Sequence, residues 1–476
     1  MTTPTEHTSQ REASDRARVI TEADDKTVHD SGAHPSSGRA LINGRTSLLL
    51  MVMAFCVSFA SFVQTASHRD ILRSSPLNGG DEDSYERLGY NLAAGLGFGY
   101  CPSDKAILSG AGEPETTPVC RQGCSAAEFS PTAYRPPGFP LLIAAVYHFS
   151  PLNFFAVRLI NCGLCALAVA VVAYVFSRYI SVLAGIGVVL LCCIDPRLRE
   201  FAGTFLTENM ATLMFSLFGV SLAGFVQTRT TRSALCCGLL LSALVLTRSF
   251  YVAWYPFLWI TAAVSLWIGY KHAALTGPRA FRSLMVFCTA SLLLTGPWWV
   301  RNCLVLNALM PTGTQGGIGI ADGFSDSAMQ NFGSWAPTTA NRIAAEIAAD
   351  PNLQHLTEIE REKEHCRRGS AAAKKWIGEN RSQLLRLSWW KLSRLWEYGS
   401  VLHGMLFSAM LAGLYLQRTH SLSRMTCLLL ILNSLTVMAT YHTYERFITP
   451  FRPLIHGFAI CGLEGIARLL WQRLRR

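Results

Sequence analysis

The sequence predicts an all-α, multi-pass membrane protein. Of its 476 residues, 50% are hydrophobic and only 15% are charged, whereas about a quarter of a soluble domain is charged. Several apolar runs approach the roughly 20 residues that a helix needs to cross a bilayer. The formal net charge is +11. In a chain this apolar, a basic surplus indicates cytoplasmic loops and anionic lipids as partners rather than nucleic acid.

Ten apolar runs are the predicted transmembrane helices. They lie at about 47–66, 155–177, 181–195, 204–226, 234–247, 250–269, 283–299, 401–416, 425–443 and 450–470. Some are short, as is expected of helices that end in a protein-lined cavity. A further run, 139–149, follows the sequence Arg-Pro-Pro-Gly. It is too short to cross, so we expect it to dip into the membrane or lie on its surface.

The basic residues of the short loops set the orientation. If the N-terminus is inside, these residues all fall on the inner side, as the positive-inside rule requires. They are Arg178, Arg229, Arg232, Lys271, Arg279, Arg282, Arg418 and Arg424, with Arg468, Arg473, Arg475 and Arg476 at the C-terminus. Both termini are therefore predicted inside, and two long loops, 67–153 and 301–400, are predicted outside.

Four parts follow from this topology. Residues 1–45 are polar and lack an apolar period, which predicts a disordered cytoplasmic tail. Residues 46–300 form an N-terminal transmembrane module that includes the first outer loop. Residues 301–400 carry amphipathic helical patterns and are expected to form a folded layer outside the membrane. Residues 401–476 contain the last helices.

Five cysteines fall in the outer loops: Cys101, Cys120, Cys124, Cys303 and Cys366. An oxidising compartment allows one or two disulfides among them. The Cys-x-x-x-Cys spacing at 120–124 also resembles half of a zinc site, but no second ligand pair follows it.

Acidic residues open the first outer loop. Asp81 and Asp83 follow two glycines at the start of a predicted helix, on which Tyr85 and Leu88 share a face. Asp81 can be read as the N-cap of this helix, with its charge facing the positive end of the helix dipole. It can also be read as a carboxylate base held at the membrane surface. The two interpretations are compatible.

Glu208 lies at the outer end of a predicted span. A carboxylate at this depth is costly unless it is paired or faces a wet cavity, so Glu208 is a candidate functional residue. The alternative is a structural ion pair with Arg197, Arg199 or Arg248.

Arg135, Arg301 and Arg446 are predicted to lie outside, against the positive-inside bias. Positive charge on this side indicates an anionic ligand such as a lipid phosphate. For Arg135 the alternative is a headgroup anchor at the bilayer surface. For Arg301 and Arg446 it is an ion pair with an acid such as Glu445.

Five stretches together resemble one known family. They are D-x-x-x-Y-x-x-L-x-x-N-L-x-x-G-x-G-F at 81–98, YRPPGFPLL at 134–142, FFAVRL at 154–159, PWWVRN at 297–302 and ERFITPF at 445–451. Their order and spacing resemble the bacterial membrane glycosyltransferases of the C-type fold, in particular the protein O-mannosyltransferase and lipid A aminoarabinose transferase group. The resemblance covers roughly residues 47–470.

The resemblance implies sugar transfer on the outer face of the bacterial cytoplasmic membrane. The donor would be a sugar on polyprenyl phosphate, and the acceptor a protein, lipid or glycan. Asp81 matches the family's catalytic Asp, with Asp83 as its rival, and Glu208 an acid that lines the site. Both Asp81 and Glu208 are candidates for a divalent-cation contact. The donor-binding set is Arg135, Arg301, Arg446 and Tyr85.

Other functions remain open at this point. The sequence has no phosphate-binding loop for ATP and no dinucleotide fingerprint. A nucleotide-sugar donor would need a cytoplasmic globular domain, for which no inner loop is large enough, so a lipid-linked donor is favoured. The alternatives are a transporter or flippase of a lipid-linked saccharide, although no internal repeat is evident, and a polymerase or ligase of surface polysaccharide.

Overall fold

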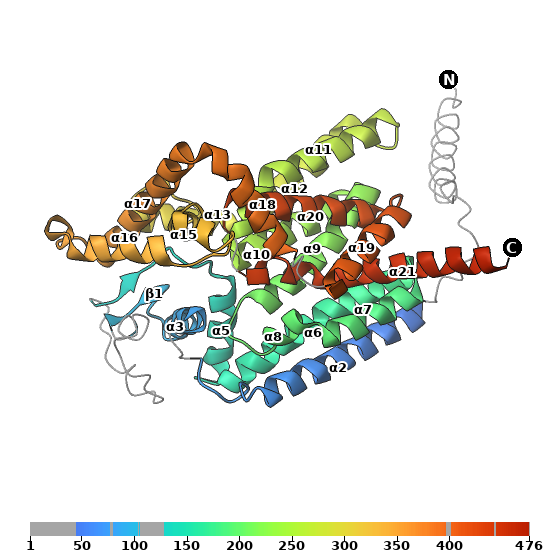
Figure 1. Ribbon diagram of the computed structural model, residues 1–476, viewed down its shortest axis with the longest axis horizontal. Helices are drawn as coiled ribbons and strands as arrows, with labels where there is room; N and C mark the ends of the chain where they lie inside the picture. The colour runs from blue at the N-terminus through green and yellow to red at the C-terminus, as the bar shows by residue number, and fades with distance from the viewer. Residues whose placement is uncertain are drawn as a thin grey trace, which may run out of the picture. The chain divides into compact units, whose positions relative to one another are not determined.

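The computed structural model describes residues 44–76, 80–102, 104, 128–396, 401–441 and 444–475 (Figure 1). Within these ranges the chain is α-helical almost throughout. The sheet consists of two antiparallel strands of two residues each, β1 (Gly99–Tyr100) and β2 (Ser130–Pro131). The predicted disordered tail, except for its last two residues, and the cysteines Cys120 and Cys124 lie outside the described residues.

Each of the ten predicted spans falls largely on helix, and residues 442–443 of the ninth lie outside the described residues. The helices are α2 (Gly44–His68), α6 (Phe154–Tyr179), α7 (Val182–Ile194), α9 (Glu208–Thr228), α10 (Thr231–Thr247), α11 (Tyr255–Lys271), α12 (Gly277–Leu293), α13 (Thr295–Leu306), α19 (Val401–Leu416), α20 (Ser421–Ala439) and α21 (Arg452–Leu474). The run 283–299 is divided, because α12 and α13 meet at a 45° bend. Short helices complete this part: α8 (Pro196–Glu200) and the 3-10 helices η2 (Ser249–Trp254), η5 (Tyr444–Phe447) and η6 (Thr449–Phe451).

Six helical segments are long and apolar enough to cross a membrane: Arg45–His68, Phe154–Tyr179, Glu208–Thr228, Ser249–Lys271, Ser421–Ala439 and Thr449–Leu474. The bent pair α12–α13 counts as a seventh if it forms one span. A helical chain with this many apolar segments is a multi-pass membrane protein. Because α7, α10 and α19 are shorter, the number of ten transmembrane helices stays a prediction. The run predicted not to cross forms α5 (Gly138–Phe149), which is also short.

Small residues bring the membrane helices close together. A Cβ on Gly413 of α19 would lie 1.8 Å from the carbonyl oxygen of Phe458 on α21. Close backbone approach through glycine is typical of helix pairs in membranes, where van der Waals contact replaces the hydrophobic effect. Large apolar side chains, such as Ile260 and Trp267 on α11, are exposed on the outer faces of these helices. Their exposure fits a lipid environment.

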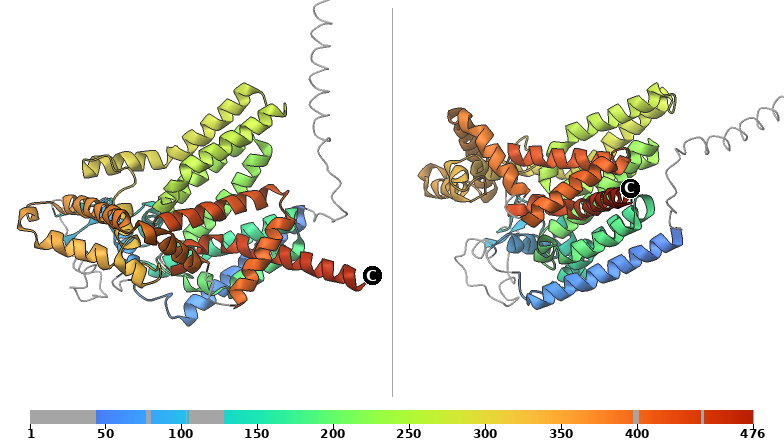
Figure 2. Two further views of the ribbon diagram at one scale, coloured as in Figure 1. Left: turned by 45° about the horizontal axis from the view of Figure 1, so that its top comes forward. Right: turned by 45° about the vertical axis from the view of Figure 1, so that its right-hand side comes forward.

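The described residues between α13 and α19 form further helices, while their place outside the membrane stays a prediction. They are α14 (Gln315–Gly323), α15 (Asp326–Gln330), α16 (Thr338–Ala349), α17 (Glu358–Glu379) and α18 (Leu384–Leu395), with η3 (Pro351–Leu353) and η4 (Arg381–Gln383). They have small apolar clusters of their own, for example Phe324, Trp376 and Leu387. In Figures 1 and 2, α16 and α17 lie at the opposite end from the C-terminus of α21.

Helix α3 (Asp81–Ala93) is polar in sequence but mostly buried. Its side chains are satisfied by neighbours: Tyr147 of α5 donates to Glu86 at 3.0 Å, and Asn91 donates to the Gly99 carbonyl at 2.8 Å. Gly89 allows α5 to approach, since a Cβ there would lie 2.5 Å from Ile143. These contacts fix the start of α3.

The N-cap interpretation of Asp81 is wrong. The N-cap of α3 is Gly80, and Asp81 is the first helical residue. The capping carboxylate is that of Asp83, which accepts a hydrogen bond from the Gly80 amide at 3.3 Å. Asp81 is therefore not needed to cap its own helix.

The described cysteines of the two predicted outer loops divide into two kinds. Cys101, which follows β1, is disulfide-bonded, so one disulfide in this part of the chain is confirmed. Cys303 on α13 and Cys366 on α17 are free thiols.

Candidate active site

Two hollows of the structure meet at Asp81. The first, which we call the inner cavity, has a volume of about 370 Å³. The second, which we call the outer groove, has a volume of about 710 Å³ and extends along α16 and α17. Both are lined by Gly80, Asp81, Tyr134, Arg135, Gly319 and Trp335. The inner cavity and the outer groove therefore share one wall, and the Asp81 carboxylate is part of that wall.

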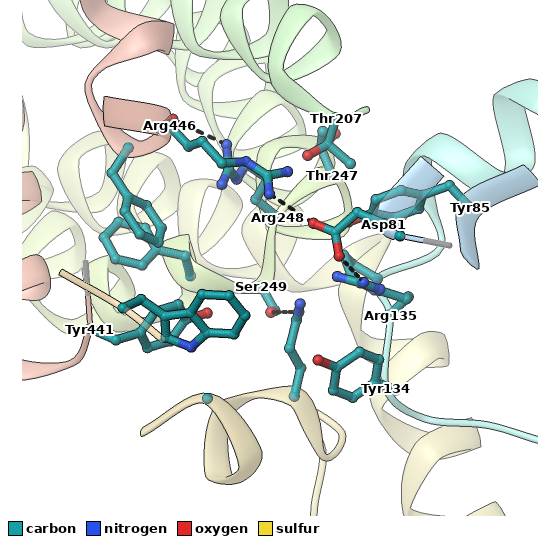
Figure 3. A pocket seen from close by; sticks show the side chains of 17 residues that line it. Asp81, Tyr85, Tyr134, Arg135, Thr207, Thr247, Arg248, Ser249, Tyr441 and Arg446 are labelled. Atoms are coloured by element: carbon teal, nitrogen blue, oxygen red, sulfur yellow. Dashed lines mark hydrogen bonds and ion pairs between the residues drawn. The ribbon is translucent and has the colours of Figure 1, made fainter. Parts of the chain in front are cut away.

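Charged side chains form an alternating series beside the inner cavity (Figure 3). The Asp81 carboxylate accepts from Arg135 through one oxygen and from Arg446 through the other, the latter at 2.7 Å. Arg446 also donates through Nε to Glu208. Arg248 completes the series, with Nη1 at 3.4 Å from the same Glu208 oxygen.

These five residues come from five distant parts of the chain. Asp81 and Glu208 are the first residues of α3 and α9, where the helix dipole favours a negative charge. Arg135 precedes Pro136 and Pro137 in the turn before α5, while Arg248 follows α10 and Arg446 belongs to η5. Three guanidinium groups face two carboxylates, so the series has a surplus of one positive charge.

Neighbouring charges shift the pKa values of Asp81 and Arg446. Burial by itself raises the pKa of Asp81, but the positive charges of Arg135 and Arg446, with their hydrogen bonds, lower it more. The net result is a pKa well below the ordinary value. Burial lowers the pKa of Arg446, whereas the carboxylates of Glu208 and Asp81 raise it more. Asp81 and Arg446 are therefore both charged at neutral pH.

Aromatic rings hold Arg135 in place. Its guanidinium lies 5.0 Å from the ring centre of Tyr85 and 4.8 Å from that of Tyr134, within the range of cation–π attraction. Its Nε also donates to Ser84 Oγ at 3.3 Å. Tyr85 itself lines the inner cavity. The structure thus brings Asp81, Glu208, Arg135, Arg446 and Tyr85 together, as the sequence led us to expect.

Asp83 and Arg301 do not join this group. Asp83 is fully buried at the start of α3, where it caps the helix. Arg301 donates to the carbonyl oxygens of Thr132 at 2.5 Å and Phe98 at 2.9 Å. Its guanidinium also lies over the rings of Phe98 and Trp298. Arg301 thereby ties α13 to the segment that leads to Arg135.

We expect Arg301→Gln to lower stability without weakening phosphate binding. The substitution removes hydrogen bonds between a charged donor and buried carbonyls, each worth about 1.5–3 kcal/mol. Thermal unfolding of the purified protein measures the first effect, and titration with polyprenyl phosphate measures the second. A large loss of affinity in a variant of normal stability would return Arg301 to the binding site.

Of the proposed partners of Glu208, the structure selects Arg248. Arg197 pairs instead with Glu200 at 2.9 Å, and Arg199 donates to Thr65 Oγ1 at 3.2 Å. The side chain of Glu445, considered as a partner of Arg446, lies outside the described residues.

Sequence reasoning missed Arg248 as a site residue. It lies between two predicted spans on the outer side, so the argument from charge against the positive-inside bias applies to it as well. Trp335 and Glu362 were also missed, and no local pattern singles them out. Glu362 of α17 accepts from Thr132 Oγ1 at 2.5 Å, Ala133 N at 3.0 Å and Thr314 Oγ1 at 2.5 Å.

The candidate metal ligands are engaged by arginines. Within the described ranges no group of three or more His, Cys, Asp or Glu side chains is close enough to hold a metal ion. Asp81 and Glu208 each accept from guanidinium groups. Both carboxylates are thus ion-paired with arginines in this structure.

No protein-family model matches this chain, and no curated protein is significantly similar to it in sequence. The site must therefore be interpreted from its own geometry.

Proposed function

We propose that this protein is a glycosyltransferase of the C-type fold that transfers a sugar from polyprenyl phosphate to an acceptor hydroxyl. The reaction would take place on the outer face of the bacterial cytoplasmic membrane. The observation that carries the proposal is the position of Asp81, a carboxylate held between Arg135 and Arg446 on the wall between two cavities. A base and an anion site are thereby adjacent, as sugar transfer from a phosphate requires.

The inner cavity suits the phosphate of the donor. Arg135, Arg248 and Arg446 line it, and a guanidinium can hold two phosphate oxygens at once. Ser249 and Phe250 also line it and begin the candidate span Ser249–Lys271. The polyprenyl chain would run from this side into the bilayer. The arginines would then stabilise the charge that grows on the phosphate as it leaves.

Asp81 would accept the proton of the acceptor hydroxyl. The acceptor oxygen bonds to the anomeric carbon, the bond from that carbon to the phosphate oxygen breaks, and polyprenyl phosphate leaves with the electron pair. In the free protein, Arg135 and Arg446 make Asp81 a weak base. A donor phosphate that takes up these arginines would weaken their hold on the carboxylate and raise its basicity. Proton transfer would thus be coupled to donor binding.

The direct test measures sugar transfer to membranes of a deletion strain. The purified protein in nanodiscs is added to these membranes together with polyprenyl-phosphate hexoses or pentoses that are radiolabelled in the sugar. We expect label to enter the envelope fraction from one of them, with release of polyprenyl phosphate. If the protein in sealed vesicles instead moves the intact donor lipid across the bilayer without cleavage, the result would contradict the proposal and favour a flippase. Growth of a lipid-linked glycan in blocks would favour a polymerase.

A further inference from the structure

The outer groove is built entirely from parts outside the candidate membrane spans. Its described lining residues come from α3 and the glycine before it, the β1–β2 strands, the segment between β2 and α5, α14, the segment before α16, and α16 and α17. None of these elements contributes to the segments that are long and apolar enough to cross a membrane. The inner cavity differs, since Ser249 and Phe250 of a candidate span line it. A ligand of the outer groove therefore approaches from the water side.

The charges of the two regions differ as well. Of the acids and bases that line the inner cavity, three are arginines and one, Asp81, is an acid. In the outer groove the acids are Asp81, Asp322, Glu358 and Glu362, against Arg135 and Arg361. The groove lacks the positive surplus that a phosphorylated or carboxylated ligand would need. The groove is therefore poorly suited to an anionic ligand.

The groove also disfavours an extended peptide. A peptide that binds beside a strand needs free main-chain groups along its edge. Beyond β2, the Ala133 amide donates to Glu362 and the Ala133 carbonyl accepts from the Thr314 amide at 3.2 Å. The Thr132 carbonyl accepts from Arg301. These main-chain groups are therefore already hydrogen-bonded within the protein.

The side chains that remain suit a carbohydrate. Trp335 lies at the junction of both cavities and is partly exposed, as is Tyr134. Flat rings can stack on the apolar C–H faces of sugars, while Asn341 and Arg361 offer hydrogen bonds to hydroxyl groups. The volume of about 710 Å³ lies in the range of about 300–1,000 Å³ typical of small-molecule sites.

We infer that the outer groove binds the acceptor, and that this acceptor is the end of a neutral glycan chain rather than a membrane lipid or an anionic polymer. The inference rests on the proposed function, because it uses the position of Asp81 between donor and acceptor. Trp335 stacks on the accepting sugar, and Asp81 receives the proton of its hydroxyl.

The test is binding, measured separately from transfer. The full chain in nanodiscs is titrated with mannohexaose and maltohexaose as neutral glycans, hexagalacturonate as an anionic glycan and a Ser/Thr-rich decapeptide, and binding is followed by saturation-transfer NMR. We expect a neutral hexasaccharide to bind and Trp335→Ala to weaken it about tenfold, the loss expected for an aromatic contact. The control Trp389→Ala alters an exposed tryptophan of α18 and should leave binding unchanged.

A second variant guards against misfolding. Ala344 is exposed on α16 and lines only the outer groove of the two cavities. Ala344→Trp should block the hexasaccharide and leave polyprenyl phosphate binding intact. Tighter binding of the peptide or of hexagalacturonate, binding of none of the four probes, or unchanged binding in Ala344→Trp would overturn the inference. Failure of the unaltered protein to bind polyprenyl phosphate would instead count against the proposed function.

Discussion

Replacing Asp81 by Asn should lower sugar transfer by about two to four orders of magnitude, the usual contribution of a general base. The amide has nearly the same shape, but its single carbonyl oxygen can replace only one of the two oxygens that accept from Arg135 and Arg446. It also cannot take a proton from the acceptor hydroxyl. Initial rates in nanodiscs measure the effect, with protein level and unfolding temperature as checks. Full activity in this variant would remove Asp81 from the catalytic role.

Asp83→Asn is the matched control. Asp83 is two residues away on the same helix, fully buried, and hydrogen-bonded to the Gly80 amide. Loss of a capping carboxylate typically costs about 1 kcal/mol. We expect lower stability and nearly normal transfer. If transfer is unaltered in the double variant Asp81→Asn/Asp83→Asn, no base in the first loop is involved.

Arg446→Gln should affect both stability and function strongly. Arg446 is paired with Asp81 and with Glu208, and the Glu208 side chain is fully buried. Removal of one partner of a buried ion pair typically costs about 3–5 kcal/mol. In this variant Glu208 would keep only Arg248, at 3.4 Å. The substitution also removes an arginine from the inner cavity. We expect a large fall in unfolding temperature and a loss of polyprenyl phosphate affinity.

A double variant separates the two roles of Arg446. In Glu208→Gln/Arg446→Gln both charges of the pair are neutral, so much of the lost stability should return. Transfer and phosphate affinity should not return. Recovery of transfer in the double variant would show that Arg446 acts only by compensating Glu208, and unfolding curves with donor titrations on all four proteins decide between the outcomes.

Local sequence patterns were sufficient where function depends on one short segment. The run of acids after Gly-Gly placed Asp81 at the start of a helix, and the Arg-Pro-Pro-Gly sequence placed Arg135 directly before a short apolar run. Neither pattern distinguished Asp81 from Asp83. Residues two apart on a helix point in different directions, and only the packing of α3 on α5 decides which carboxylate faces the cavity.

Ion pairs and hydrogen bonds between residues far apart in the sequence could not be predicted in the same way. Charge against the positive-inside bias gives the side of the membrane on which an arginine lies, but not its partner. Arg301 and Arg248 satisfy the same rule, yet Arg301 binds main-chain carbonyls and Arg248 pairs with Glu208. The outer groove depends on contacts such as that between Glu362 and Thr132, 230 residues apart, for which the sequence carries no local signal.

The carboxylates beside the arginines also determine which anions can bind. Asp81 and Glu208 are counter-ions of these arginines and belong to the same chain. They compete with a dissolved anion for the arginines at an effective concentration that reaches the millimolar range or higher. A dissolved phosphate ion at a lower concentration would have to displace them with nothing else to favour it. A donor brings a sugar and a lipid chain in addition to its phosphate. If the protein binds such a donor, the internal ion pairs would favour this membrane-anchored ligand over simple salts.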